Sequence, residues 1–574
     1  MTGADLVVKM LEEYGVRYVF GLPGDTSVAL YEAFRRSRKV EHVLTRDERS
    51  SAYMADAYAK ITGAVGVCEG PSGGGALYLI PGVSESDGSR VPLVSLTTDT
   101  PLSSDGRGSL TSLDQVELFG PVCRLAARVL QPAKVPESMR RAFRYATAPR
   151  QGATQVILPE DVLSGPVCAG GVADLYAEER HASFPAYRYS PPAAEVEAAA
   201  ALLARASRPI ILCGGGLHLS GAGDELRQLA EETSTPVVTT LNGKGSLEEV
   251  HPLSLGVCGG NGAKQATNEA VRNADVVLIV GSRLNSTSTA GGSIFNDGAR
   301  LVQVDLDPAQ IGNNYRLEVG LAGDARPVLA ALAVLSRPPG DDRRHWARGC
   351  REAVRQELDA YEQCAAADCS PFLPHLVVRA LERTLPGDSI LLCDAGTPTP
   401  YVAAYYRPAT AGRTFIAGRA HGSLGYALPA AIGAKIGAPD RTVAALFGDG
   451  SFGMACGELE TIGRRRLPLI LISFRNGCYS WIKCLQKLYY NEGYFGVDLG
   501  VHADYSEVAR ACGIHAARPG SGPELEEELR RAVASDAPAF VEVMTGCMTG
   551  FTPPVAAWQR DSRLDPEQRQ RKSY

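Results

Sequence analysis

Short apolar runs that end at glycine or proline alternate with stretches of helical periodicity along the whole chain, and this alternation constrains the fold more than any other feature. It is typical of α/β domains, in which buried parallel strands alternate with helices. The runs that predict strands are 16–20, 42–44, 65–68, 91–96, 155–158, 210–213, 237–239, 276–280, 301–304, 390–393, 443–446, 469–474 and 540–543. The stretches that predict helices include 6–14, 27–35, 48–60, 193–206 and 456–464.

The length of the chain requires more than one hydrophobic core, because 574 residues exceed what a single core usually supports. Proline and serine are concentrated over 181–192, and an Arg-Pro-Pro-Gly run at 337–340 precedes a charged segment. Both stretches predict breaks between domains. We therefore predict three doubly wound parallel-sheet α/β domains, over 1–165, 190–335 and 365–550.

The composition argues against several classes of protein. Hydrophobic residues make up 45% and charged residues 21%, which is ordinary for a soluble globular protein. The net charge of −6 offers no basic surplus for nucleic acid or an anionic membrane. Apolar runs are shorter than a membrane span, and Asp5 and Lys9 interrupt any signal-like start. The 14 scattered cysteines lack metal-type spacing, so we expect a cytoplasmic protein with reduced thiols.

Asp449 and Asn476 follow two successive strand-like runs, and they are the sharpest chemical signal in the sequence. Asp449 lies in a Gly-Asp-Gly-Ser segment directly after the run 443–446, and Asn476 follows the run 469–474. One helical crossover separates the runs, so both residues should lie at the carboxyl edge of one parallel sheet, where ligands bind. Gly-Asp-Gly alone could be a simple turn. The pairing with Asn476 favours a Mg²⁺ site that also takes diphosphate oxygens.

This pair, with Glu458-Leu459 and Leu467-Pro468 between its members, resembles the cofactor-anchoring motif of thiamine-diphosphate-dependent enzymes. The resemblance covers nearly the whole chain, in the domain order of the acetolactate (acetohydroxyacid) synthase and pyruvate oxidase group. It implies a pyrimidine-binding domain, a central domain and a diphosphate-binding domain, in that order. The metal ligands that it implies are the side chains of Asp449 and Asn476 and the backbone carbonyl of Cys478. The other cofactor contacts that it implies at this edge are Gly448, Gly450, Ser451 and Tyr479. Family members usually have Asn where this chain has Arg475.

The segment 44–59 resembles the part of these enzymes that carries the activating glutamate, and Glu48 is the residue that aligns. Thiamine reacts as the C2 carbanion, which forms when a glutamate hydrogen-bonds the pyrimidine and promotes its imino tautomer. Such a glutamate must be buried and able to hold a proton. The alternative is an ordinary surface glutamate in the first turn of a helix, a role that the neighbouring Asp47 also suits.

Three further segments resemble cofactor-binding parts of the same family. Gly24 belongs to a first glycine turn at 20–25, and Asp394, Gly396 and Thr397 form a loop that would touch the diphosphate. The segment 418–433 resembles the part under the thiazolium, in which Gly422, Ser423 and Leu424 would contact the cofactor and Leu424 would hold it bent. His421 could contact substrate or could be a solvated loop residue. The segment 479–483 is expected to line the substrate pocket.

The central domain has a glycine turn at 213–216 that could be taken for a dinucleotide site. The third glycine and the downstream acid do not fall at fingerprint positions, so an NAD-type oxidoreductase is disfavoured. Segments 281–283 and 305–308 lie where flavin-binding relatives contact FAD. FAD is therefore possible but not expected.

Several positions depart from the synthase pattern and point to a changed donor or acceptor. Residues 73–78 replace the usual Gly-Pro-Gly and Thr-Asn, and the active-site glutamine of synthases falls at Thr111. The arginine that grips the acceptor carboxylate falls at Thr287, and threonine cannot replace a bidentate arginine. The paired histidines of simple pyruvate decarboxylases are missing from 103–113.

The resemblance implies an enzyme that uses thiamine diphosphate and Mg²⁺, adds to a 2-oxo acid such as pyruvate and decarboxylates it. It would then transfer the activated aldehyde unit to an acceptor. The alternatives are a non-oxidative 2-oxo-acid decarboxylase and a cofactor-binding homologue without turnover. In the family, Glu48 and Asp449 meet across a subunit boundary, so we expect a homodimer or a dimer of dimers. We expect neither a nucleic acid nor a membrane as a partner.

Overall fold

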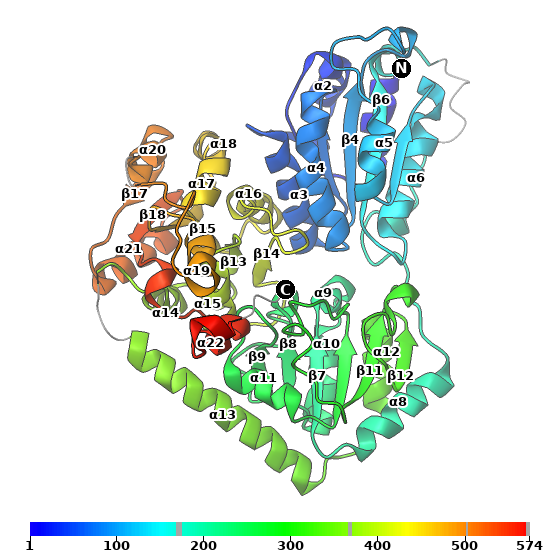
Figure 1. Ribbon diagram of the computed structural model, residues 1–574. Coiled ribbons are helices and arrows are strands. Elements are labelled where there is room, and N and C mark those ends of the chain that lie inside the picture. The colour runs from blue at the N-terminus through cyan, green and yellow to red at the C-terminus, as the bar shows by residue number, and fades with distance from the viewer. Residues whose placement is uncertain (168–174, 366–369, 501–502, 570–574) are drawn as a thin grey trace. The chain divides into compact units, whose positions relative to one another are not determined.

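The computed structural model describes residues 1–167, 175–365, 370–500 and 503–569. It contains three sheets of six strands each, and every strand pair that it records within them is parallel (Figure 1). The prediction of three parallel-sheet α/β domains is therefore confirmed. Among the described residues, no helix is long and apolar enough to cross a bilayer.

The chain separates into two compact units. An N-terminal unit contains residues 1–187, 418–440 and 455–465, and a C-terminal unit contains residues 188–417, 441–454 and 466–574. The boundary between Tyr187 and Arg188 falls inside the proline- and serine-rich stretch that predicted a break. The predicted domain limits of 1–165, 190–335 and 365–550 stay predictions.

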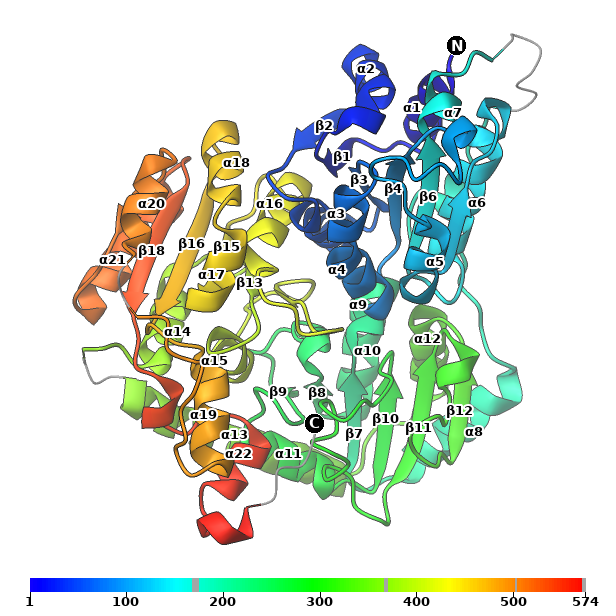
Figure 2. The same ribbon diagram turned by 45° about the horizontal axis from the view of Figure 1, so that its top comes forward.

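The first sheet has the order β2-β1-β3-β4-β6-β5 and belongs to the N-terminal unit (Figure 2). Its strands are β1 Tyr18–Gly21, β2 Glu41–Leu44, β3 Gly66–Gly70, β4 Leu93–Asp99, β5 Leu125–Arg128 and β6 Ala153–Pro159. Its α-helices are α1 Gly3–Glu13, α2 Val28–Arg36, α3 Glu48–Thr62, α4 Gly74–Gly88, α5 Gln115–Phe119, α6 Val135–Thr147 and α7 Glu160–Ser164. Buried aliphatic and aromatic side chains from these strands and helices form one core.

Two helices from later in the chain, α16 (Ala427–Gly437) and α18 (Glu458–Arg465), also belong to the N-terminal unit. Helix α16 packs closely on α3, because a Cβ at Gly433 would lie 1.9 Å from the carbonyl oxygen of Met54. The fully buried Asp56 of α3 accepts hydrogen bonds from Tyr426 Oη at 2.6 Å and from Lys60 Nζ at 2.7 Å. This network fixes α3, whose first residue is Glu48.

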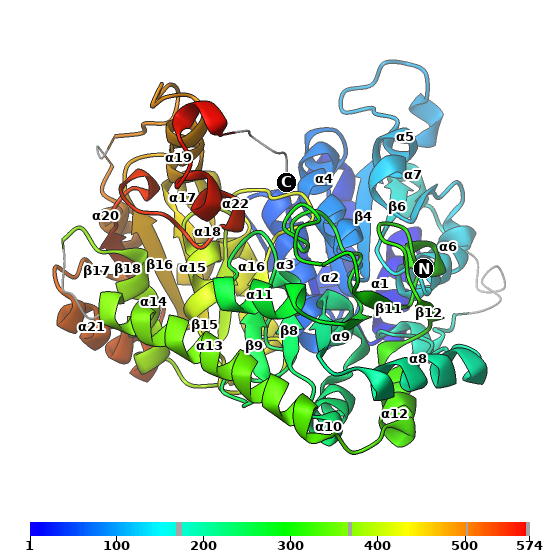
Figure 3. The same cartoon turned by 60° about the horizontal axis from the view of Figure 1, so that its bottom comes forward.

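The second sheet has the order β12-β11-β10-β7-β8-β9 and lies in the C-terminal unit. Its strands are β7 Pro209–Cys213, β8 Val237–Thr239, β9 Ser254–Val257, β10 Val276–Val280, β11 Arg300–Asp305 and β12 Val319–Ala322. The α-helices associated with it are α8 Ala193–Arg205, α9 Gly215–Ser220, α10 Gly223–Thr233, α11 Gln265–Arg272 and α12 Ala325–Leu335. The long α13 (Asp341–Ala365) then runs past α11 to α14 (Pro374–Thr384; Figure 3).

The third sheet has the order β14-β13-β15-β16-β18-β17 and completes the C-terminal unit. Its strands are β13 Ile390–Cys393, β14 Phe415–Ala417, β15 Val443–Gly448, β16 Leu469–Arg475, β17 His515–Ala517 and β18 Ala539–Met544. The remaining α-helices of this part of the chain are α14 Pro374–Thr384, α15 Pro398–Tyr405, α17 Asp449–Ala455, α19 Ser480–Tyr489, α20 Tyr505–Ala511, α21 Gly522–Ala534 and α22 Ala556–Asp561.

The structure corrects one predicted element. A helix was predicted to begin at residue 456, but α17 begins at Asp449 itself, directly after β15, and α18 follows at Glu458. Phe452 explains the early start, since it is buried on α17 against Phe447 of β15 and Phe540 of β18. The helix end that could serve an anion is therefore the start of α17.

Candidate active site

Asp449 is held at the carboxyl edge of the third sheet. Strands β15 and β16 pair through Gly448 and Phe474, so the residues that follow them lie side by side. Asp449 Oδ2 accepts the backbone N–H of Asn476 at 2.9 Å and that of Gly477 at 3.2 Å. Burial raises the pKa of Asp449, and these two hydrogen bonds offset the effect only in part.

The other carboxylate oxygen of Asp449 lacks a hydrogen bond among the described residues. Asp449 is 3% exposed, and its Oδ1 is buried without a hydrogen-bond partner among the described residues. A buried carboxylate oxygen without a partner is costly unless a proton or a cation meets it. The structure therefore offers at this position a buried carboxylate oxygen, which is a type of ligand that suits a divalent cation.

Asn476 supplies the second oxygen of this edge. Its Oδ1 accepts the N–H of Cys478 at 3.3 Å and the thiol of Cys478 at 3.2 Å, so the side chain is oriented by its own loop. The loop is held in turn by Tyr479 N, which donates to the carbonyl of Val497 at 2.8 Å. A carboxylate and an amide oxygen are hard oxygens of the kind that Mg²⁺ prefers, and the carbonyl of Cys478 stays the third predicted ligand.

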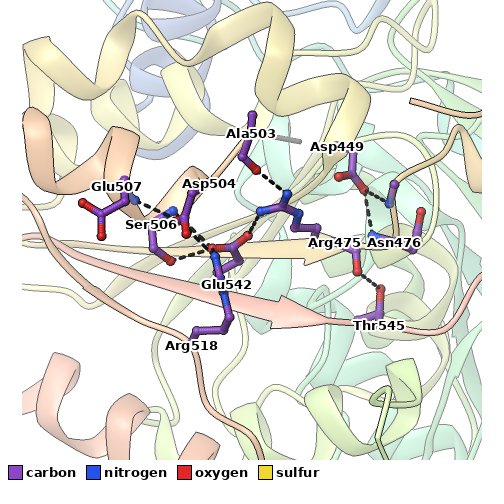
Figure 4. Close-up of polar contacts among 11 residues, drawn as sticks. Asp449, Arg475, Asn476, Ala503, Asp504, Ser506, Glu507, Arg518, Glu542 and Thr545 are labelled. Carbon is purple, nitrogen blue, oxygen red and sulfur yellow. Dashed lines mark hydrogen bonds and ion pairs between the residues drawn. The ribbon is translucent and has the colours of Figure 1, made fainter. Parts of the chain in front are cut away.

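Arg475 departs from the family pattern, and the structure shows where its side chain goes (Figure 4). It forms an ion pair with the fully buried Glu542 of β18 and donates to the carbonyl of Ala503. Glu542 also accepts from Ser506 Oγ at 2.6 Å and from Arg518 at 2.7 Å. Arg475 is thus part of a charged network with Glu542. The predicted metal ligand is the next residue, Asn476.

The other predicted diphosphate contacts of the C-terminal unit lie at the ends of β13 and β15. The loop after β13 contains Gly396 at φ +120°, and a side chain there would be strained. The ring of Tyr479 packs directly on Gly450, since a Cβ at Gly450 would lie 2.3 Å from Tyr479 Cε1. Of the predicted contacts, Asp394 and Thr397 are buried in the loop after β13, and Ser451 is buried in the first turn of α17. Gly448 pairs with Phe474 at the end of β15.

Glu48 is the first residue of α3 and is 7% exposed. Two glycines make room for it: a Cβ at Gly75 would lie 2.9 Å from Glu48 Oε1, and one at Gly70 would lie 3.4 Å from Glu48 Cγ. Burial raises the pKa of Glu48, and the charges of Asp47 and Glu69 add to the rise. The alternative that Glu48 is an ordinary surface glutamate in the first turn of a helix is therefore wrong. Its role toward a cofactor stays a prediction.

A second buried acid, Glu69, lies close by and was missed by the sequence analysis. Glu69 is fully buried on β3 and accepts hydrogen bonds from Tyr31 Oη and from His42 Nε2, the latter at 3.0 Å. Gly21 on the neighbouring strand provides the space, since a Cβ there would lie 1.9 Å from Glu69 Oε1. No spacing pattern marks a single acid inside an apolar strand, so only the fold reveals it.

The remaining predicted contacts of the N-terminal unit lie in turns. Gly24 donates its N–H to Ser27 Oγ at 2.9 Å and packs on Pro71. Gly422 has φ +69°, a value that favours glycine, and Ser423 and Leu424 follow it in a partly exposed loop. His421, which precedes this turn, is exposed and its ring lies 3.2 Å from the carbonyl of Ser84. Gly24, Glu48 and this loop thus belong to the N-terminal unit, and the other predicted site residues to the C-terminal unit.

Two cysteines meet beside the predicted metal loop, and the sequence analysis singled out only one of them. Cys478 Sγ lies 3.6 Å from Sγ of Cys547, which follows β18. Ser480 Oγ and Thr549 Oγ1 also donate to Cys547 Sγ, at 3.4 Å and 3.3 Å. The hydrogen bond from Cys478, followed by those from Ser480 and Thr549, holds the pKa of the Cys547 thiol below its usual range.

Thr111, one of the positions that depart from the synthase pattern, has a structural role of its own. Thr111 has φ +68°, and its hydroxyl forms a hydrogen bond with the hydroxyl of Ser72 at 2.8 Å.

In the central sheet, Gly214 and Gly281 pack against each other, since a Cβ at Gly214 would lie 2.3 Å from the carbonyl of Gly281. That packing explains the glycine turn at 213–216 without a dinucleotide. Whether FAD binds here stays open as a prediction.

Comparison with protein families gives three matches in the order of the three sheets. Residues 1–118 match the N-terminal TPP binding domain of thiamine pyrophosphate enzymes, residues 196–332 their central domain, and residues 394–543 their C-terminal TPP binding domain. The chain belongs to the thiamine pyrophosphate enzyme family.

Within that class the chain is acetolactate synthase-like. It is 33% identical to the probable acetolactate synthase large subunit of Methanocaldococcus jannaschii, over 95% of this chain and 92% of the relative. It is 30% identical to the acetolactate synthase large subunit of Corynebacterium glutamicum, over 98% and 90%. It is 31% identical to the acetolactate synthase isozyme 2 large subunit of Escherichia coli, over 95% of each chain.

Proposed function

We propose that this enzyme uses thiamine diphosphate and Mg²⁺ to decarboxylate a 2-oxo acid related to pyruvate and to transfer the resulting aldehyde unit to an acceptor. The observation that carries the proposal is the geometry of Asp449. One oxygen is held by the backbone N–H groups of Asn476 and Gly477, and the other is buried without a hydrogen-bond partner among the described residues.

Asp449, Asn476 and the carbonyl of Cys478 would hold Mg²⁺, and the start of α17 would face the diphosphate. The negative charge of a diphosphate needs a cation to join it to a carboxylate edge. When bound, thiamine diphosphate supplies a carbanion that adds to the keto carbon and takes up the electrons released with CO₂. Ser451, which is buried in the first turn of α17, would donate its hydroxyl hydrogen to a diphosphate oxygen.

Glu48 would hold and move a proton. Its raised pKa favours a carboxyl group that donates a hydrogen bond to a pyrimidine nitrogen and later takes the proton back. Burial also excludes the water that would otherwise compete for that hydrogen bond. Both roles follow from an acid enclosed by Gly70 and Gly75.

Incubation with pyruvate, with and without candidate acceptor aldehydes and 2-oxo acids, tests the function. CO₂ release and products are followed by mass spectrometry in the presence of thiamine diphosphate and Mg²⁺. Release of CO₂ with formation of a new carbon–carbon bond supports the proposal. Release of CO₂ with free aldehyde as the only product would instead support the decarboxylase alternative. Cofactor binding without CO₂ release from any 2-oxo acid would support the non-catalytic homologue.

We also propose that the active form is a homodimer or a dimer of dimers in the cytoplasm. The support is the resemblance, in which the glutamate and the metal ligands of one site come from different subunits. A two-fold axis then creates two such sites at once. Light scattering of the purified protein gives the assembly, and an active monomer would contradict it.

A further inference from the structure

Glu69 is a buried acid near Glu48 that the proposed mechanism does not use. It is the fourth residue of β3 and is fully buried, and Gly21 of β1 makes room for its side chain. Its Oε2 is buried without a hydrogen-bond partner among the described residues. A buried carboxylate oxygen without a partner costs free energy, so a neutral side chain would serve the packing of this strand better.

Two side chains from neighbouring elements fix the position of the Glu69 carboxylate. Tyr31 of α2 donates its hydroxyl hydrogen to Glu69 Oε1, and His42 Nε2 of β2 lies 3.0 Å from the same oxygen. His42 Nε2 also lies 3.0 Å from Tyr31 Oη, so the three polar atoms form a triangle. The two rings pack on each other, with centroids 4.7 Å apart. The carboxylate is therefore held at one position.

The sheet places this triangle beside Glu48. Gly70 follows Glu69 on β3, and a Cβ at Gly70 would lie 3.4 Å from Glu48 Cγ. On β1, Gly21 pairs with Glu69 on one side and with Leu44, four positions before Glu48, on the other. The two acids therefore lie at the same carboxyl edge of the first sheet.

Several charged groups surround Glu48, and most of them are neutralised. Burial raises the pKa of Glu48 most, the charges of Asp47 and Glu69 raise it further, and the charge of Arg49 opposes them. Asp47 and Arg49 form an ion pair with each other at 2.6 Å. Glu458 of α18 accepts a backbone N–H before the start of α3, and burial raises its pKa and so favours its neutral form. Glu69 thus supplies the negative charge that remains beside Glu48.

The two partners of Glu69 do not remove its charge. Burial and the charges of Glu69 and Glu48 raise the pKa of Tyr31, so its hydroxyl stays a neutral donor. His42 would offset the charge of Glu69 only when the imidazole is protonated. The negative charge of Glu69 therefore acts on Glu48 whenever His42 is neutral.

We propose that Glu69 is a positioning residue whose buried negative charge keeps the proton on Glu48, so that Glu48 can donate a hydrogen bond to the cofactor. Two acids that lie close together in a protein interior do not both ionise readily. The proton stays on Glu48 because Tyr31 and His42 already meet Oε1 of Glu69. The role of Glu48 toward the cofactor rests on the proposed function, whereas the coupling between the two acids does not.

A double-mutant cycle in the full-length protein without cofactor measures this coupling. Denaturant unfolding gives the stability that Glu48→Gln adds at neutral pH, once in the wild type and once in Glu69→Gln. We expect a smaller gain in the Glu69→Gln background, because the charge that opposes the ionisation of Glu48 is absent there. In acid, where the carboxyl groups are protonated, the two substitutions should be additive.

The pH profile of C2-hydrogen exchange in the cofactor-loaded protein gives a second readout. Glu69→Gln should exchange within about twofold of the wild type at acidic pH and about threefold or more slowly at alkaline pH, because Glu48 loses its proton earlier. The alkaline limb of the profile therefore moves to lower pH. A residue that only supported the fold would lower the whole profile without moving that limb.

Two further variants complete the test. Glu137→Gln, at an exposed acid of α6 in the same unit, is the charge-matched control and should change neither the coupling nor the profile. Glu69→Leu decides if Glu69→Gln fails to fold, since it also removes the charge. Tyr31 Oη and His42 Nε2 stay within hydrogen-bond distance of each other in that variant. Glu69→Leu should move the alkaline limb in the same direction.

The inference is overturned if Glu48→Gln and Glu69→Gln are additive at neutral pH, or if the alkaline limb does not move. Failure of both Glu69 variants to fold would also overturn it, since Glu69 would then serve the stability of the first sheet.

The proposed function fails in a different way. If the wild type releases CO₂ from a 2-oxo acid and the two acids are not coupled, only the inference on Glu69 is wrong. If the wild type releases no CO₂ from any 2-oxo acid, the proposed function is wrong, and the cycle without cofactor still decides whether Glu69 holds the proton on Glu48.

Discussion

At the scale of single residues, Glu48 shows how the surroundings decide what an acid can do. The sequence left two interpretations, an exposed helix-start glutamate and a buried proton carrier. The fold encloses the side chain between two glycines and raises its pKa. Asp47, one position earlier, caps α3 by accepting from Arg49 N at 2.8 Å and has an ordinary structural role.

Glu48→Gln should keep cofactor affinity and slow the exchange of the C2 hydrogen of thiamine diphosphate by about 100-fold or more, because only proton transfer is lost. The exchange is followed in D₂O by NMR after acid quench. Asp47→Asn, which keeps a capping side chain, is the matched control and should exchange nearly as the wild type does. Undiminished exchange in Glu48→Gln would remove Glu48 from the mechanism.

The same variant should also affect stability in a way that depends on pH. The folded-state pKa of Glu48 is raised, so ionisation opposes folding as the pH rises above the ordinary glutamate value of about 4.3. Glu48→Gln should therefore be more stable than the wild type at neutral pH, and the difference should vanish in acid. Denaturant unfolding of the two proteins at neutral pH and in acid measures this difference in the free energy of unfolding. A variant that is less stable at neutral pH would contradict the raised pKa.

At the scale of elements, the sequence predicted the central strands and missed strands at the sheet edges. The missed strands β5, β9, β12, β14 and β17 are all edge strands of their sheets. Edge strands pair on one side only, and some are short and partly exposed, so their apolar signal is weak. Asp449 and Asn476 were predictable because strong central strands, β15 and β16, precede them. Glu69 and Cys547 were not, since no pattern within one strand reports a partner on another.

The ion pair between Arg475 and Glu542 joins β16 to β18 and gives an element-scale prediction. Arg475→Met should destabilise the protein by about 3 kcal/mol, because it leaves a buried carboxylate with one partner fewer. Arg530→Gln, which breaks an exposed pair on α21, should cost less than about 1 kcal/mol. Denaturant unfolding measures both values.

The pH dependence of this pair has the opposite sign to that of Glu48. Burial alone would raise the pKa of Glu542, but hydrogen bonds from Ser506, Arg475 and Arg518 lower it below the ordinary value. A lowered acid pKa gives stability that is present above about pH 4.3 and is lost as the pH falls through the folded value. The cost of Arg475→Met should therefore shrink in acid. If the destabilisation by Arg475→Met stayed constant down to acid pH, its cause would be lost packing and not the lost ion pair.

At the scale of the whole molecule, the predicted site residues are divided between two compact units of one chain. If the site is shared between subunits, Glu48→Gln and Asp449→Ala should complement each other. Mixing the two inactive variants should restore activity at about one quarter of the wild-type level for random dimers, since only one site of a hybrid is intact. Hybrids that form but stay inactive would contradict a shared site.

The central claim is that Asp449 holds the cation that joins thiamine diphosphate to the protein, and one titration tests it most directly. Calorimetry of the cofactor is performed with and without Mg²⁺ on the wild type, on Asp449→Ala and on Asp536→Ala, an exposed control in the loop between α21 and β18. Loss of outer-shell partners costs metal sites about 10- to 100-fold, and loss of a ligand should cost more. The account predicts Mg²⁺-dependent binding in the wild type and the control that falls by at least about 100-fold in Asp449→Ala. Equal affinity in all three proteins would contradict it.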